Sequence, residues 1–297
     1  MFQKARRRLV VPFLLPQTAL YLIFMFAPLV MTVIYAFTNW EGHGMKWQFA
    51  GLYNFSVILR DHLFRNAVRN SFYLVLVGGA LLFPLAMAMA WSLHEPIRAK
   101  KVFRFIILAP VVLSVSVAGL MWKWMYNPTY GLINPVLNGI GLQKLALPWL
   151  GEPRTALTAI IIASIWHGIG TWVLLLSAGL ERIPPDLPEA ARVDGANDWQ
   201  VFRHITIPLM WEVLRILLVL WVMQALQAFT FVYVMTGPVS VGGPMNSTEL
   251  MATYVFKNAF VNFKWAYAMA LATAMLIMIF VLSVFTNRAL LREAVEY

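Results

Sequence analysis

The sequence is poor in charge. Of its 297 residues, 12% are Asp, Glu, Lys or Arg, whereas 61% are hydrophobic. A soluble globular domain has about 25% charged and about 45–50% apolar residues. This balance argues against a water-soluble fold, and we expect an all-α membrane protein whose solvent is a bilayer.

Cysteine is absent, which excludes disulfides and thiolate metal sites but does not fix the redox compartment. The chain also lacks the G-x-x-x-x-G-K-[ST] loop that binds nucleotide phosphates. We therefore expect no catalytic residue, metal or cofactor on this chain, and we predict that it is not an enzyme. The net charge of +10 comes from short loops without a continuous basic face, which argues against nucleic acid as a partner.

Six apolar stretches approach or exceed the roughly 20 residues that span a bilayer. They are residues 11–37, 72–91, 105–122, 156–179, 217–235 and 265–286. The first follows Arg6–Arg8 and is uncharged from residue 9 to residue 40, which is longer than a secretory signal requires. We predict a retained first helix and one transmembrane domain over residues 1–297, with a core at 68–290 and a cytoplasmic loop at 182–210.

Lys and Arg in the loops favour an orientation with both termini in the cytoplasm. The cytoplasmic segments would then hold Lys4, Arg6, Arg7, Arg8, Arg98, Lys100, Lys101, Arg104, Arg182, Arg192, Arg203, Arg288 and Arg292. The outer residues Arg60, Arg65 and Arg69 oppose the rule.

Two outer segments have patterns of their own. Apolar residues recur at helical spacing over 52–67, which predicts an amphipathic helix at the membrane surface, either a cap on the bundle or a binding element. Residues 126–154 are rich in Asn, Pro and Gly, which predicts a loop ordered by turns.

The cytoplasmic loop predicts two short helices. Asp186 is the expected N-cap of the first, with Glu189 completing a capping box, and Gly195 is the expected terminator. Asp198 is the expected cap of the second helix, which runs toward Pro208. The local chemistry fits a docking lever and an ordinary tight connection equally well.

This loop resembles the E-A-A motif of binding-protein-dependent ABC importer permeases. That pattern reads E-A-A, three residues, G, nine residues, I, one residue, L-P. The chain has Glu189-Ala190-Ala191, Gly195, Ile205 and Ile207-Pro208, and departs from it only by Ile207 for Leu. Residues 51–55, 127–134 and 243–248 resemble the G-L-x-N-F, N-P-x-x-G-x-x-N and G-G-P-x-x-S-T elements of maltose-type carbohydrate permeases.

The resemblance implies a type I importer permease with six transmembrane helices in the bacterial cytoplasmic (inner) membrane. Its expected partners are a second permease subunit, two ATP-binding subunits that hold ATP and Mg²⁺, an extracytoplasmic solute-binding protein and membrane lipid. The ATPase-coupling contacts carried over from the family are Glu189, Ala190, Ala191, Asp194 and Gly195.

The same resemblance places the substrate site on the fifth span. The family's sugar-contacting positions fall on Trp221, Ala225 and Ala228, where the relatives have polar residues. Trp221 could stack on a pyranose, while Gln224 and Gln227 either bind hydroxyls or bridge helices. The expected cargo is a di- or oligosaccharide, and the alternative is a phosphorylated polyol such as glycerol 3-phosphate.

His167 is the single ionisable residue within the six stretches, and it fits a helix-packing hydrogen bond better than a proton relay. An ion-coupled secondary transporter would ordinarily show acidic residues or broken helices within its spans. A membrane enzyme would need a catalytic cluster. The candidates for that cluster are His94, Glu95, Glu181, Asp186 and Glu189.

Overall fold

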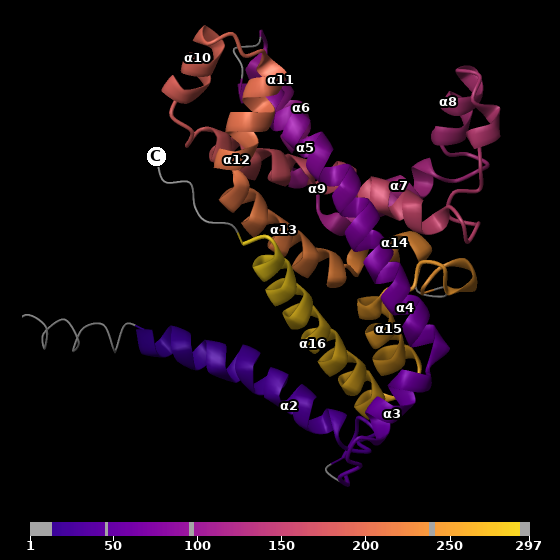
Figure 1. Ribbon diagram of the computed structural model, residues 1–297. Coiled ribbons are helices and arrows are strands. Elements are labelled where there is room, and N and C mark those ends of the chain that lie inside the picture. The colour runs from indigo at the N-terminus through magenta and orange to yellow at the C-terminus, as the bar shows by residue number, and fades with distance from the viewer. Residues whose placement is uncertain (1–13, 45–46, 95–97, 238–240, 292–297) are drawn as a thin grey trace, which may run out of the picture. The chain divides into compact units, whose positions relative to one another are not determined.

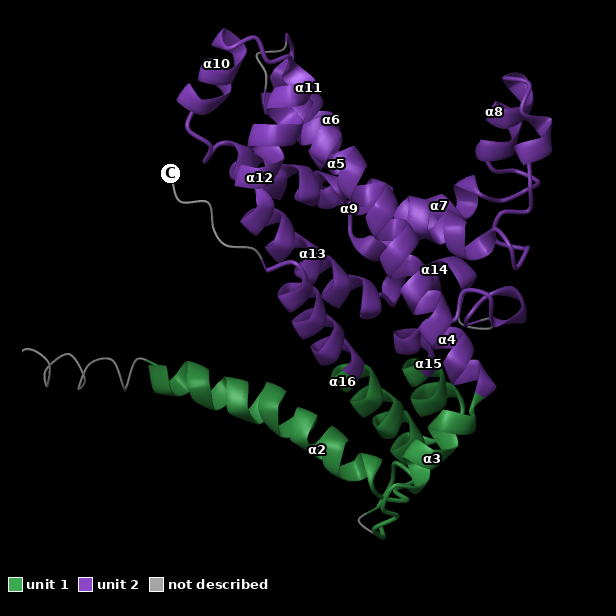
Figure 2. Ribbon diagram, viewed as in Figure 1, with its two compact units in different colours: residues 1–61, 255–277 green, residues 62–254, 278–297 purple. Residues whose placement is uncertain are grey.

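The computed structural model describes residues 14–44, 47–94, 98–237 and 241–291, and these residues are almost entirely helical (Figure 1). Their one β pairing is an isolated bridge between Thr38 and Phe49. The chain divides into two compact units, residues 1–61 with 255–277 and residues 62–254 with 278–297 (Figure 2). The single transmembrane domain over residues 1–297 stays a prediction.

The first unit contains η1 (Leu22–Phe26), α2 (Ala27–Ala36), α3 (Tyr53–Arg60), η6 (Lys257–Val261) and the first half of α16 (Trp265–Ala289). The second begins with α4 (His62–Tyr73), η2 (Leu74–Gly78), α5 (Gly79–His94), α6 (Lys100–Val112), α7 (Val115–Met125), α8 (Ile133–Gly139), η3 (Gln143–Leu145) and α9 (Ala156–Leu180). It continues with α10 (Asp186–Val193), α11 (Asp198–Val201), η4 (Phe202–Thr206), α12 (Ile207–Leu209), α13 (Trp211–Leu226), α14 (Thr230–Thr236) and η5 (Pro244–Asn246). Helices α15 (Met251–Phe256) and α16 pass from one unit to the other.

Five helical stretches in the described residues are long and apolar enough to cross a membrane. They are Leu14–Ala36, His62–His94, Ala156–Leu180, Trp211–Thr236 and Trp265–Ala289. Their outward faces carry large apolar side chains such as Phe24, which is 74% exposed, and Phe280, which is 68% exposed. Such surfaces are stable against lipid and not against water, so the predicted all-α membrane class is confirmed.

The third predicted span is not one straight helix. Helices α6 and α7 are long and apolar enough to cross a membrane only when they are taken together. They meet at a bend of 98°. Pro110 lies in the last turn of α6, and the Ser114 side chain accepts a hydrogen bond from the Val117 N–H at the start of α7. The proline ends one helix and the serine caps the next, so the count is five spans, or six with the bent pair.

The fifth predicted span is also interrupted. Residues 227–229 separate α13 from α14, although hydropathy runs unbroken through them. Hydropathy indicates how apolar a stretch is. It gives no sign of a break in the helical backbone when the residues around the break are apolar. The span predicted over 217–235 is thus found within Trp211–Thr236, and it contains a short break that the sequence did not indicate.

The segment 52–67 is two helices instead of one. Helix α3 ends at Asp61, whose backbone is extended, and α4 begins at His62. Helix α4 continues through η2 into α5, so the second membrane helix starts ten residues before the predicted position 72. Residues 126–154 hold only the short elements α8 and η3 among turns, as predicted.

The orientation stays a prediction. Lys4, Arg6, Arg7, Arg8 and Arg292 lie outside the described residues, as do both chain ends and the start of the first predicted span.

Helix α9 lies at the centre of the second unit. It packs against α5, α6, α7, α13 and α14, and more than half of its most apolar stretch is buried. Small residues allow this crowding. At Gly170 a Cβ atom would lie 2.5 Å from the Ile107 carbonyl oxygen, so α6 and α9 meet backbone to backbone.

This contact predicts the effect of Gly170→Val. The valine would have to displace α6, and overpacking of this kind costs about 1–3 kcal/mol. We expect a lower midpoint of thermal unfolding in detergent. Gly168→Val is the matched control, because a Cβ atom at Gly168 meets nothing within 4 Å on the same helix. Equal loss in both variants would show that the close approach at Gly170 contributes nothing.

Candidate functional site

The first helix of the cytoplasmic loop, α10, begins one residue earlier than predicted. Pro185 occupies the N-cap with helical dihedral angles, and no side chain caps the helix. The Glu189 N–H donates to the Pro185 carbonyl oxygen at 3.1 Å. The prediction that Asp186 caps α10 in a box with Glu189 is therefore wrong, because Pro185 already turns the chain into the helix.

Gly195 ends α10 as predicted. Its φ is +89°, a region that favours glycine. The Gly195 N–H donates to the Arg192 carbonyl oxygen at 3.1 Å, and the Ala196 N–H donates to the Ala191 carbonyl oxygen at 2.9 Å. These two bonds form a Schellman motif, which satisfies the last carbonyls of the helix.

The second helix of the loop is capped by Asn197 instead of Asp198. The Asn197 side chain accepts from the Gln200 N–H, and the Gln200 side chain accepts from the Asn197 N–H. Asp198 is thereby the first helical residue, and its carboxylate lies 3.3 Å from the Arg192 guanidinium. This ion pair joins the two short helices.

A series of short helical elements leads from Asp198 to the candidate membrane span that starts at Trp211. It passes through η4, where π-helical geometry precedes Pro208, and reaches α13. The Met210 N–H donates to the Thr206 carbonyl oxygen and the Leu214 N–H to the Met210 carbonyl oxygen, both at 2.9 Å. A series of helical elements therefore leads from the loop to the break at residue 227, with interruptions at Pro208, which has no N–H, and at Met210, where α12 ends and α13 begins.

The predicted coupling residues lie on a displayed surface. Glu189, Ala190, Asp194 and Gly195 are exposed and Ala191 is half-buried. Helix α10 contains no buried residue. Val193 beside them is 88% exposed and Trp199 on α11 is 64% exposed, so both short helices carry exposed apolar side chains. Figure 1 shows α10 and α11 near one another.

A cavity of about 390 Å³ lies beneath α10. Three of the residues considered for a catalytic cluster, His94, Glu181 and Glu189, line it, together with Arg192. Asp186 is not among its lining residues, and Glu95 lies outside the described residues. Within the described part of the chain, no group of three or more His, Cys, Asp or Glu could hold a metal ion.

A second cavity, of about 330 Å³, lies at the break in the fifth span. All five predicted substrate residues line it: Trp221, Gln224, Ala225, Gln227 and Ala228. Helix α9 contributes Ser164, His167 and Trp172 to the opposite wall, and Val115 comes from the start of α7. The sequence did not indicate Ser164 or Val115, because nothing local marks a contact between helices distant in the chain. That the five predicted residues together bind the substrate stays a prediction.

Trp221 is fixed within this wall. Its indole N–H donates to the Val75 carbonyl oxygen at 2.9 Å, at a π-helical turn of the second span. A Cβ atom at Gly78 or Gly79 would lie 2.8 Å from the indole ring, so only glycine leaves room for it. Trp172 meets the ring nearly edge-on, with centroids 5.9 Å apart.

Gln224 and Gln227 are exposed toward the cavity. Neither side chain hydrogen-bonds another residue in the part of the chain described, so no bridge between helices of this chain accounts for them. Both amides can therefore bind a ligand or a second protein.

His167 satisfies the bend in the third span. Its Nε2 donates to the Leu113 carbonyl oxygen at 3.0 Å, where α6 ends. Phe231 meets its ring edge-on at 5.6 Å. This is the packing hydrogen bond that the sequence favoured over a relay.

The motif asparagines hold loop backbones. In the first unit, the Asn54 amide donates to the Ala36 and Thr38 carbonyl oxygens, both at 2.9 Å. In the second unit, the Asn134 amide donates to the Leu147 carbonyl oxygen and its Oδ1 accepts from the Trp149 indole.

The sequence did not identify Glu249 as a buried carboxylate. Glu249 is 1% exposed and accepts a 2.6 Å hydrogen bond from the Thr253 hydroxyl. It follows the 243–248 motif and lies outside the membrane-spanning stretches, so the scan of those stretches for acidic residues passed over it.

Comparison with known proteins gives one consistent answer. Residues 80–294 match the family of binding-protein-dependent transport system inner membrane components. The trehalose/maltose transport system permease protein MalF of Thermococcus litoralis is 34% identical over 82% of this chain and 80% of its own. The diacetylchitobiose uptake system permease protein NgcF of Streptomyces coelicolor is 32% identical over 86% of this chain and 75% of its own.

The fold is similar to that of a bacterial alginate ABC transporter crystallised in complex with an alginate pentasaccharide-bound periplasmic protein. The TM-score is 0.83 at 23% identity, over 99% of this chain and 98% of the other. This likeness concerns the fold alone, whereas the family match covers most of the chain. The chain belongs to the binding-protein-dependent transport system inner membrane components, and is a multi-pass permease of that family.

Proposed function

We propose that this permease is a membrane subunit of an ATP-driven importer of carbohydrates, with a di- or oligosaccharide as cargo. The relatives named above for trehalose/maltose and for diacetylchitobiose support this substrate class. The solute would be delivered by an extracytoplasmic binding protein, as the family description implies.

The observation that carries the proposal is the cavity at residues 227–229. Discontinuous helices commonly form substrate sites in transporters, because the broken helix presents polar groups inside the membrane. Here the break brings two unpaired amides, Gln224 and Gln227, beside the aromatic rings of Trp221 and Trp172. A sugar offers hydroxyl groups to the amides and apolar C–H faces to the rings.

The cavity is small for an oligosaccharide. Its 330 Å³ lies at the lower end of the range of about 300–1,000 Å³ for small-molecule sites. We infer that a second permease subunit supplies the facing wall, and that exposed Gln224 and Gln227 lie toward it.

The cytoplasmic loop would couple this cavity to ATP hydrolysis. An ATP-binding subunit would seat α10 through Glu189, Ala190, Ala191, Asp194 and Gly195, and two copies of that subunit would hold ATP and Mg²⁺. The short helical elements from Asp198 to Leu226 are joined across Met210 by its hydrogen bonds with Thr206 and Leu214, and they connect the loop to the cavity wall. The cytoplasmic position of both termini belongs to the same proposal.

The other candidates fit the cavity less well. A phosphorylated polyol calls for a cation, and no Lys or Arg is among the residues described as lining the cavity. Lys123 instead donates to the Val234 carbonyl oxygen, and Arg215 lies 3.9 Å from Glu212. A secondary transporter would share the broken helices seen here, but the family match identifies a binding-protein-dependent system.

The substrate class is tested on the cognate binding protein and the assembled transporter. Candidate sugars and glycerol 3-phosphate are titrated into the binding protein, and each loaded form is then added to the transporter to measure ATP hydrolysis. We expect a sugar to bind and to stimulate hydrolysis. Stimulation by glycerol 3-phosphate alone would replace the proposed cargo.

The coupling loop predicts different outcomes for two substitutions of Gly195. Both Gly195→Ala and Gly195→Asp strain a residue with positive φ, whereas a Cβ atom there meets nothing within 4 Å. The aspartate therefore adds a charge at the docking surface without an internal clash. We expect Gly195→Asp to abolish uptake and to release the ATPase, measured by co-purification, while Gly195→Ala retains most of both. Equal loss in both variants would attribute the defect to the helix end.

The cavity predicts that Gln224→Ala raises the sugar concentration at half-maximal uptake by roughly 3- to 10-fold, the size of one or two lost hydrogen bonds. Met223→Ala is the control, because Met223 is the neighbouring exposed residue on α13 and does not line the cavity. Trp221→Ala is a poorer probe, since it also removes the hydrogen bond to Val75. An unchanged uptake curve for Gln224→Ala would move the site elsewhere.

The hydrogen bond of His167 to the bend predicts that a neutral donor can replace the imidazole. His167→Gln keeps an N–H donor, and we expect near-parental uptake and thermal stability. His167→Leu removes the donor and should cost about 0.5–1.5 kcal/mol of stability. Loss of uptake in both variants, with His167→Gln as stable as the parent, would show that the imidazole acts in transport itself, either at the cavity that it lines or as a proton relay.

A further inference from the structure

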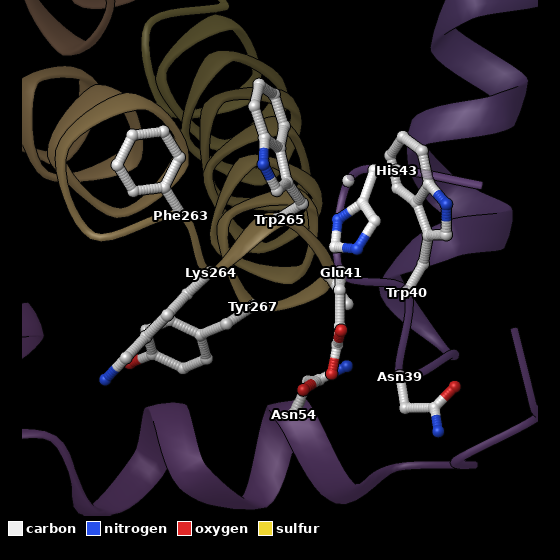
Figure 3. Close-up of a pocket in the computed structure, with 11 residues that line it drawn as sticks. Asn39, Trp40, Glu41, His43, Asn54, Phe263, Lys264, Trp265 and Tyr267 are labelled. Atoms are coloured by element: carbon white, nitrogen blue, oxygen red, sulfur yellow. The ribbon is translucent and has the colours of Figure 1, made fainter.

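A third cavity, of about 690 Å³, lies within the first unit, far along the chain from the residues discussed above. The loop after the first span forms one wall through Asn39 to His43, and residues 263–267 at the start of α16 form the other (Figure 3). Asn54 of α3 also lines it. Nothing in the proposed transport cycle uses this cavity.

Its walls carry aromatic rings held in fixed positions. The Trp265 ring packs directly on Gly42, where a Cβ atom would lie 1.9 Å from the indole. Gly42 has a φ of +90°, so the close approach and the backbone both require glycine. Tyr35 stacks on one face of Trp40 at 4.6 Å, and the Trp40 indole donates to the Gly44 carbonyl oxygen at 3.1 Å.

The two tryptophans face a common space. Their ring centroids are 6.3 Å apart and the planes are inclined by 56°. The Ala266 N–H donates to the Trp40 carbonyl oxygen at 3.1 Å, which ties the two walls together. Phe263, which is 68% exposed, has a φ of +54°, a genuine outlier for a bulky residue.

Polar groups with spare hydrogen-bonding capacity line the rest of the cavity. The Asn39 Oδ1 accepts from the Gln48 N–H at 2.7 Å, which leaves the amide N–H groups of Asn39 as donors. Glu41, Asn39 and His43 are exposed, and Glu41 forms no ion pair with another described residue. The buried Asn54 spends its amide N–H groups on two backbone carbonyls, which leaves its Oδ1 as an acceptor. Figure 3 shows the Glu41 carboxylate directed toward Asn54.

We propose that this cavity is a second carbohydrate subsite, on the extracytoplasmic side of the permease. A pyranose ring presents an apolar C–H face, which packs on an indole, and a rim of hydroxyl groups, which donate to carboxylate and amide oxygens. Trp265 and Trp40 supply the apolar surface for the C–H face, and Glu41, Asn39 and Asn54 supply the polar groups for the hydroxyls. The volume lies within the range for small-molecule sites.

The arrangement of charge selects a neutral sugar over an anion. Lys264 is the one Lys or Arg among the lining residues described, and in Figure 3 its side chain extends past Tyr267, away from Glu41. An aromatic pair beside a carboxylate also fits a quaternary ammonium group, but such a ligand would hydrogen-bond neither the Asn39 amide N–H groups nor the Asn54 Oδ1, which a sugar hydroxyl can reach.

The position in the chain gives this subsite a role. The loop of residues 37–52 directly follows the first membrane helix, so the proposed orientation places it outside the cytoplasm. This inference rests on the proposed carbohydrate function. The subsite would hold sugar at the outer surface, where the binding protein releases it, before the sugar reaches the membrane cavity.

The test uses the full-length permease in the assembled transporter, with 5-fluorotryptophan in place of tryptophan. The ¹⁹F resonances of Trp40, Trp265, Trp221 and Trp199 are assigned by single Trp→Phe substitutions. Maltotetraose, cellotetraose and chitotetraose are then titrated separately. Mannitol, an open-chain polyol without a ring face, and choline are titrated as comparison ligands.

We expect at least one tetrasaccharide to shift the Trp40 and Trp265 resonances, with mannitol and choline causing no change and Trp199 unaffected. Glu41→Gln should weaken this response roughly tenfold, the size of one lost hydrogen bond to a charged group. Phe49→Ala is the matched control, since Phe49 lies on the same loop, is 76% exposed and does not line the cavity; its response should equal that of the parent.

Three outcomes would overturn the subsite: no shift of Trp40 and Trp265 with any tetrasaccharide, a shift with choline alone, or equal weakening by Glu41→Gln and Phe49→Ala. The Trp221 resonance separates this failure from failure of the proposed function. A sugar that moves Trp221 but neither Trp40 nor Trp265 leaves the importer proposal standing. A binding protein that takes up no sugar contradicts the importer proposal whatever the ¹⁹F spectra show.

Discussion

The bilayer offers no hydrogen bonds, and the structure of this permease depends on how it meets that constraint. A regular helix satisfies its own backbone, but every bend or π-helical turn frees a carbonyl oxygen that protein must cover. His167 covers Leu113 at the bend of the third span, and the Trp221 indole covers Val75 at the π-helical turn of the second. Both donors come from other helices, so these two irregularities are each stabilised by a tertiary contact, and the Val75 carbonyl oxygen accepts from the Gly79 N–H as well.

These same donors enclose the membrane cavity. His167 and Trp221 both line it, and each has a structural hydrogen bond as well as a face toward the open space. Gln224 and Gln227 differ from them, because their amides are left without partners in the described chain. The cavity wall thus contains donors that are used in structural hydrogen bonds, His167 and Trp221, beside the amides of Gln224 and Gln227. Only these two amides are free to bind a solute. Gln224 and Gln227 are three residues apart, which places both on the side of α13 that lines the cavity.

Local chemistry predicted the cytoplasmic loop well and its helix starts poorly. Gly195 was identified correctly, because a helix end with positive φ leaves few alternatives to glycine. The N-caps were each displaced by one residue, since Pro185 and Asn197 compete with Asp186 and Asp198 for the same position. Adjacent residues differ little in the free energy that they contribute as N-caps. Tertiary packing supplies more than this difference and therefore decides which residue caps the helix. Asp198 instead pairs with Arg192, which no local rule anticipates.

The sequence by itself determined the solvent and the family. Apolar runs can be stable only in lipid, and the E-A-A pattern is a linear motif that is read without coordinates. The absence of cysteine and of a G-x-x-x-x-G-K-[ST] loop predicts that the chain has no thiolate or nucleotide site of that kind. Pro110 and Ser114 mark the bend of the third span locally, whereas tertiary structure alone decided where the fifth span breaks and which residues of α9 face it. It also decided that Trp40 and Trp265, distant in the chain, share one cavity. Hydropathy averages over windows of about 20 residues, whereas a binding site is made by single side chains brought together from separate helices.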